Sequence, residues 1–152
     1  MIMDIQEHLP QLKTIFETHG VVLAYLFGSQ AQGTAGPLSD LDIAVLLSPE
    51  VPRERWTEVQ IKLICDLMSV FHHNDVDVII LNRAPALLAY EAARYGKIIY
   101  QDASQPHLDF LVLATSRYAD TRWLRDIFTA YLLERAAERA ALRSKASMEA
   151  MV

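Results

Sequence analysis

A Gly-Ser pair and three aspartates are the residues whose types and spacing could do chemistry in this sequence. Gly28 and Ser29 end one apolar run, and Asp40 and Asp42 open the next. A glycine at a strand end lets a ligand approach the backbone, and free N–H groups in the turn after it favour phosphate oxygens. Asp40 and Asp42 alternate along a strand, so their side chains share a face, with backbones roughly 6–7 Å apart. Two carboxylates this close repel each other unless a cation neutralises them, and such oxygen ligands suit Mg²⁺.

A third carboxylate follows in a later apolar segment. Asp77 lies between Val76 and Val78, where a lone acid needs a partner. If its strand lies beside the strand that starts at Asp40, three carboxylates and a phosphate-binding turn come together, as in two-metal phosphoryl or nucleotidyl transfer. Asp75, two residues earlier, is the rival for the third position. The alternative explanation of Asp77 is an edge-strand acid that faces water.

The periodicity of apolar residues predicts the elements that must position these side chains. The predicted helices span residues 4–18, 53–71 and 85–95. The predicted strands span residues 21–27, 40–47, 76–81 and 97–100. The connection between the first two strands holds no full helix, so that pair should be antiparallel. The expected fold class is α+β, with a mixed β-sheet of about four strands flanked by helices.

The chain after Pro106 is predicted to be helical to about Arg143, in one or two pieces. An apolar stripe runs along this part and consists of Trp123, Leu124, Ile127, Phe128, Tyr131 and Leu132. Such a stripe most often packs on its own domain, and the other interpretation is a protein interface, where Trp and Tyr are frequent. We therefore predict a core over residues 1–103 and a C-terminal helical extension over 104–152, packed on the core or on a partner.

Composition excludes several classes of protein. The chain has 152 residues, 52% of them hydrophobic, which suits one domain with a buried core. Its net charge of -5 argues against direct nucleic-acid binding, which usually needs a basic face. No segment has the roughly 20 apolar residues of a membrane span, and the N-terminus lacks a signal-peptide pattern, so a cytoplasmic location is expected. Cys65, the single cysteine, is expected to be buried, and His72, His73 and His107 are expected at the surface.

The wording and spacing of these motifs resemble the polymerase-β-like nucleotidyltransferase superfamily, and in particular its minimal, MNT-type members, over about residues 20–100. The residues that carry the resemblance are Gly28, Ser29, Asp40, Asp42 and Asp77. It implies that the Gly-Ser pair binds the phosphates of ATP. It also implies that the three aspartates form a two-metal Mg²⁺ site, and that Asp77 helps to activate the acceptor hydroxyl.

The same resemblance implies an activity and a partner. Members of the superfamily transfer a nucleoside monophosphate and release pyrophosphate, and many MNT-type proteins are antitoxins paired with a HEPN ribonuclease toxin. Such antitoxins can attach AMP to a tyrosine of the toxin. We therefore expect a Mg²⁺-dependent enzyme that moves AMP from ATP to a HEPN toxin. Two alternatives stay open: a non-catalytic antitoxin that neutralises by binding, and a nucleotidyltransferase that modifies a small molecule such as an aminoglycoside.

One feature departs from the family pattern. Relatives often carry a basic residue in the loop after the Gly-Ser pair, but no Lys or Arg occurs between Ser29 and Asp40. The charge of a triphosphate would then be met by metals, by backbone or by an arginine from elsewhere. Arg83 and Arg94 are the candidates, and the sequence selects neither.

Overall fold

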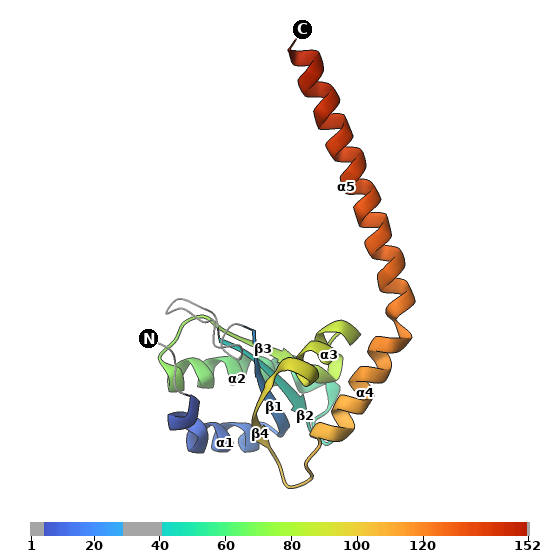
Figure 1. Ribbon diagram of the computed structural model, residues 1–152. Coiled ribbons are helices and arrows are strands. Elements are labelled where there is room, and N and C mark those ends of the chain that lie inside the picture. The colour runs from blue at the N-terminus through green and yellow to red at the C-terminus, as the bar shows by residue number, and fades with distance from the viewer. Residues whose placement is uncertain (1–4, 29–40, 152) are drawn as a thin grey trace. The chain divides into compact units, whose positions relative to one another are not determined.

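The computed structural model describes residues 5–28 and 41–151, and within these ranges a four-stranded sheet has the order β3-β2-β1-β4 (Figure 1). The strands are β1 (Val21–Phe27), β2 (Leu41–Leu47), β3 (Val76–Ile80) and β4 (Lys97–Gln101). Strand β1 pairs antiparallel with both β2 and β4, whereas β2 and β3 are parallel. The predicted antiparallel first pair and the mixed sheet are therefore confirmed.

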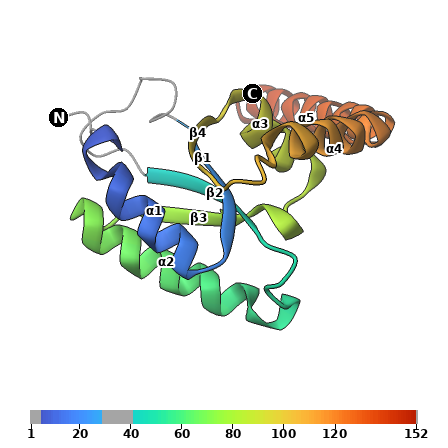
Figure 2. The ribbon, with the colours of Figure 1, turned by 90° about the horizontal axis from the view of Figure 1, so that it is seen from below.

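Helices cover both faces of this sheet, as Figure 2 shows. The helical segments are η1 (Ile5–His8), α1 (Leu9–Thr18), η2 (Arg53–Arg55), α2 (Trp56–Phe71), η3 (Leu81–Arg83), α3 (Ala86–Tyr95), α4 (His107–Asp120) and α5 (Arg122–Ala150). Helices α1 and α2 pack on one face, and α3 and the start of α4 pack on the other. Each face therefore has its own hydrophobic core.

The alternation along β2 decides which face receives its acidic residue. Leu41, Ile43 and Val45 are fully buried in the core beneath α1 and α2. Asp42 and Ala44 alternate with them and so lie on the opposite face, where Ala44 packs in the core beneath α3. The burial of these three apolar side chains fixes the orientation of β2, and so fixes the face on which the Asp42 carboxylate lies.

The second core contains a buried polar contact that the sequence did not indicate. Tyr25 is fully buried, and its hydroxyl lies 2.6 Å from Nδ1 of His107 at the start of α4. Burial raises the pKa of the Tyr25 phenol, so the hydroxyl stays protonated and can donate a hydrogen bond to the imidazole. The expectation of a surface position for His107 is wrong, because this residue anchors α4 to β1 and is half-buried.

Cys65 also differs from expectation, because its side chain is exposed. The buried residues of α2 are Val59, Leu63, Leu67 and Phe71, which follow one another at intervals of four. Position 65 lies two residues from Leu63 and two from Leu67, on the outer side of the helix. Free cysteine is usually buried, but the position of Cys65 on the helix places it on the face opposite the buried residues of α2.

Residues 116–152 form a second unit that comprises the end of α4 and all of α5. Helix α5 contains no buried residue, and it continues to Ala150, beyond the predicted end near Arg143. The residues of the apolar stripe on α5 are 50–64% exposed, and the packing of this extension on the core or on a partner stays a prediction. Among the described helices, none is long and apolar enough to cross a membrane.

Candidate functional site

Gly28 and Asp42 meet at the end of the β1–β2 pair. Phe27 is opposite Asp42 in the register, and Gly28 follows with φ of +75°, a left-handed conformation that favours glycine. A Cβ atom placed on Gly28 would lie 2.7 Å from Oδ2 of Asp42. The Asp42 carboxylate therefore fills the space that a side chain at position 28 would need. This contact could not be predicted from the sequence, because it depends on the register of two strands.

Asp77 lies directly beside Asp42 in the sheet. The parallel register of β2 and β3 pairs these two residues, so their side chains share a face on strands about 4.8 Å apart. Asp42 is half-buried and Asp77 is exposed. Strand β3 is also an edge of the sheet, but its acid does not stand alone there. The condition that the sequence set for Asp77, a third strand beside the second, is therefore met.

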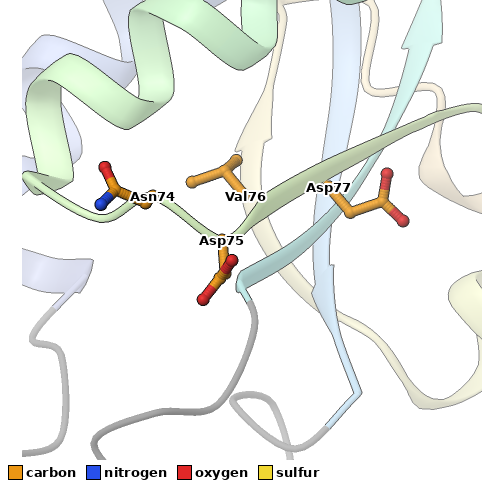
Figure 3. A pocket seen from close by; sticks show the side chains of 4 residues that line it. All are labelled: Asn74, Asp75, Val76 and Asp77. Atoms are coloured by element: carbon orange, nitrogen blue, oxygen red, sulfur yellow. The ribbon is translucent and has the colours of Figure 1, made fainter.

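The start of β3 lines an open hollow at the same end of the sheet. Its volume is about 310 Å³, and Asn74, Asp75, Val76 and Asp77 line it (Figure 3). The backbone N–H of Asp75 donates to Nδ1 of His73 at 3.0 Å, and its carbonyl accepts from Leu41 N at 2.8 Å. Figure 3 shows the carboxylate of Asp77 on the side of β3 away from α2, while Asp75 lies by the start of β2. Asp77, and not Asp75, is the residue in register with Asp42.

The described part of the site is incomplete as a metal centre. Ser29 and Asp40, which the sequence predicts as a phosphate ligand and a metal ligand, lie outside the described residues. Within the ranges 5–28 and 41–151, no three His, Cys, Asp or Glu side chains are grouped so that they could hold a metal ion. The two carboxylates that the structure does bring together, Asp42 and Asp77, offer only oxygen donors, and this donor chemistry fits Mg²⁺.

Arg83, one of the two candidates for binding a triphosphate, is engaged elsewhere. It lies in η3, after the end of β3 that is remote from Asp77. Its guanidinium donates to Oγ1 of Thr57 at 3.1 Å and to Oε1 of Gln60, both on α2. Gln60 in turn donates to the carbonyl of Val78 at 2.6 Å. Arg83 therefore joins α2 to β3 rather than serving the acidic end of the sheet.

Comparison with known proteins adds three findings. The family model for polymerase beta nucleotidyltransferases matches residues 10–105. The protein adenylyltransferase MntA of Shewanella oneidensis is 33% identical over 115 residues, which are 75% of this chain and 71% of the relative. The crystal structure of a toxin-antitoxin with AMP-PNP is similar with a TM-score of 0.70 at 26% identity, over 82% of this chain and 98% of that chain.

A further solved structure agrees in fold. It contains a tri-AMPylated Shewanella oneidensis HEPN toxin in complex with an MNT antitoxin. The TM-score is 0.66 at 23% identity, and the match covers 86% of this chain and 99% of that chain. At this level of identity the likeness supports the architecture of the sheet and its helices.

Proposed function

The chain belongs to the polymerase beta nucleotidyltransferase family, and from this premise we propose that it is a Mg²⁺-dependent protein adenylyltransferase that acts as the antitoxin of a HEPN toxin. The observation that carries the proposal is the pairing of Asp42 with Asp77 on one face, against the backbone of Gly28. This is the arrangement that nucleotidyl transfer needs, with oxygen ligands for cations beside a backbone that a phosphate can approach.

In the proposed reaction the hydroxyl oxygen of a toxin tyrosine attacks the α-phosphorus of ATP, the bond from that phosphorus to the bridging oxygen breaks, and pyrophosphate and the hydroxyl proton are released. Asp42, Asp77 and Asp40 would hold Mg²⁺, and the metal would supply positive charge that stabilises the phosphates and lowers the pKa of the acceptor hydroxyl. Asp77 is exposed at the sheet edge, where an incoming acceptor can reach it, and there it helps to orient the acceptor oxygen. Gly28 and Ser29 bind the phosphate oxygens through backbone N–H groups.

A protein acceptor suits this chain better than a nucleic acid or a drug. The net charge of -5 opposes the binding of a long phosphate backbone, and the relative MntA is a protein adenylyltransferase. An aminoglycoside would be attracted by the same acidic end of the sheet. Mass spectrometry therefore decides between the acceptors: AMP-sized additions to the co-expressed toxin, with ATP and Mg²⁺ present, support the proposal. Additions to an aminoglycoside with none on the toxin contradict it.

A second function, neutralisation by binding, is favoured by α5. We propose that the apolar stripe of α5 binds the toxin, because a large exposed apolar surface marks an interaction site. The relative with AMP-PNP is itself a toxin-antitoxin structure. This proposal gives the C-terminal extension a partner to pack on, and it can hold whether or not AMP is transferred.

A charge in the middle of the stripe should weaken the complex. Phe128 is 58% exposed, and burying it in the toxin would make Phe128→Asp cost about 2 kcal/mol or more, which is roughly 30-fold in Kd. Titration of the toxin by isothermal calorimetry measures the change. Thr129→Asp is the matched control, because it adds the same charge one residue further on, away from the stripe. Equal affinities for the two variants would place the interface elsewhere.

A further inference from the structure

The end of the sheet that carries Asp42 and Asp77 also receives the C-terminus of α3. Strand β4 begins at Lys97, opposite Leu26, one residue before the Phe27 that pairs with Asp42. Only Gly96 separates Lys97 from the last residue of α3, so this helix ends where the acidic end of the sheet begins (Figure 1). A Cβ on Gly96 would lie 3.0 Å from Cβ of Tyr25, which shows how closely the helix end approaches β1.

Helix α3 lies on the same face of the sheet as the two acids. Its buried residues are Ala89, Ala92 and Ala93, which pack in one core with Tyr25 and Ala44. Ala44 is the neighbour of Asp42 on its side of β2, since side chains two apart share a face. The last turn of α3 therefore shares both the end and the face of the sheet with the carboxylate pair.

That last turn presents an exposed cation held against an aromatic ring. The Cζ atom of Arg94 lies 5.5 Å from the centre of the Tyr95 ring, and both side chains are exposed. The ring of Tyr95 meets that of Tyr90 edge to face, with centres 6.5 Å apart. None of the ion pairs formed between described residues uses Arg94. Its exposed guanidinium therefore lies within cation–π distance of the Tyr95 ring.

The other cations in the described part of the first unit are placed differently. Arg53 and Arg55 follow the remote end of β2, and Arg83 bonds to α2. Lys13 and Lys62 pair with Glu17 and Glu58. Lys97 lies at the same end of the sheet as Asp42 and Asp77 but on the opposite face. Its partner Leu26 points into the core beneath α1 and α2, and paired residues share a face.

We propose that Arg94 binds the triphosphate of the nucleotide donor, with Tyr95 as the residue that positions its guanidinium. The inference rests on the proposed function. It supplies a cation for the triphosphate in a chain that has no Lys or Arg between Ser29 and Asp40. A guanidinium presents paired N–H donors that match two phosphate oxygens, which a carboxylate-lined site cannot supply. The planar guanidinium is also pre-organised, so less side-chain freedom is lost for each hydrogen bond that it forms.

Binding of AMP-PNP and of AMP to the full chain, each with Mg²⁺, tests the proposal by calorimetry. Arg94→Ala should raise the Kd for AMP-PNP by about tenfold or more and leave the Kd for AMP within about twofold, because AMP lacks the outer phosphates. Arg94→Lys should fall between, since it keeps the charge and loses the paired donors. Lys97→Ala is the matched control and should change neither Kd by more than about twofold.

Two results would overturn the assignment. Equal affinity of wild type and Arg94→Ala for AMP-PNP means that this arginine does not bind the donor. An equal loss for AMP-PNP and AMP means that it does not act on the outer phosphates. Wild-type protein that binds no AMP-PNP would instead count against the proposed function itself, so the two failures can be told apart.

Discussion

Asp42→Asn should lower the rate of AMP transfer to the toxin by about 10³-fold or more, because a metal-bound carboxylate contributes several kcal/mol of charge stabilisation in the transition state. Asparagine keeps the size of the side chain beside Gly28 and removes its negative charge. Loss of one of two neighbouring carboxylates also relieves their repulsion, so the free energy of unfolding should hold or rise. Intact-mass spectrometry of the toxin over time, with denaturant unfolding of the variant, measures both quantities.

Asp109→Asn is the matched control for this variant. It makes the same chemical change at an exposed residue of the first turn of α4. The control should transfer AMP at close to the wild-type rate. Wild-type transfer by Asp42→Asn would reject the metal-site assignment. A variant without transfer that still neutralises the toxin in cells would show that binding alone is sufficient.

Gly28→Ala should lower AMP transfer by about 100-fold, since several kcal/mol of the barrier depend on the placement of the carboxylate that the new Cβ would displace. The added atom would lie 2.7 Å from Oδ2 of Asp42, so the carboxylate must move. The left-handed backbone adds about 1–2 kcal/mol of strain for a residue with a side chain. Transfer rate and thermal midpoint, measured on the same preparation, separate the two effects.

Gly20→Ala offers a control with the same backbone and a different neighbour. Gly20 has φ of +74°, and its added Cβ would lie 2.6 Å from Cγ2 of Val51. It precedes β1 at the end of the strand remote from Asp42. Both alanine variants should lose similar stability, but only Gly28→Ala should lose activity. Similar transfer rates for the two would mean that the space beside Asp42 is not needed for catalysis.

The sheet could be predicted from the sequence because its cause is local. Alternation along residues 41–47 determines which side chains enter the core, and the short link between β1 and β2 excludes a parallel crossover. From the sequence, Asp77 could approach Asp42 only if their two strands were neighbours. The parallel register of β2 and β3 shows that they are. The roles of Ser29 and Asp40 stay predictions, as they lie outside the described residues.

The features that escaped the sequence depend on distant partners. His107 was expected at the surface because its partner Tyr25 is far away along the chain and the sequence does not indicate their contact. The sequence gives no reason to prefer Arg94 or Arg83 as a phosphate ligand. They differ in position, because β4 begins at the acidic end of the sheet, next to Arg94, whereas η3, which holds Arg83, follows the other end of β3. Cys65 is a different case, since the interval of four among the buried residues of α2 would have placed it outside.

The strand order also bears on how the chain folds. The chain between β2 and β3 contains only η2 and α2, so the pairing of Asp42 with Asp77 closes a shorter length of chain than the pairing of Leu26 with Lys97. Loop-closure entropy grows with length, so the segment with the acids should assemble before β4 is added. Val78→Ala should therefore slow folding more, relative to its loss of stability, than Ile99→Val, as measured by stopped-flow refolding in urea. If Ile99→Val slowed folding more than Val78→Ala, relative to the loss of stability, β4 and β1 would form the folding nucleus. If Val78→Ala has the larger effect, the end of α3 that bears Arg94 is the last part of the site to fold.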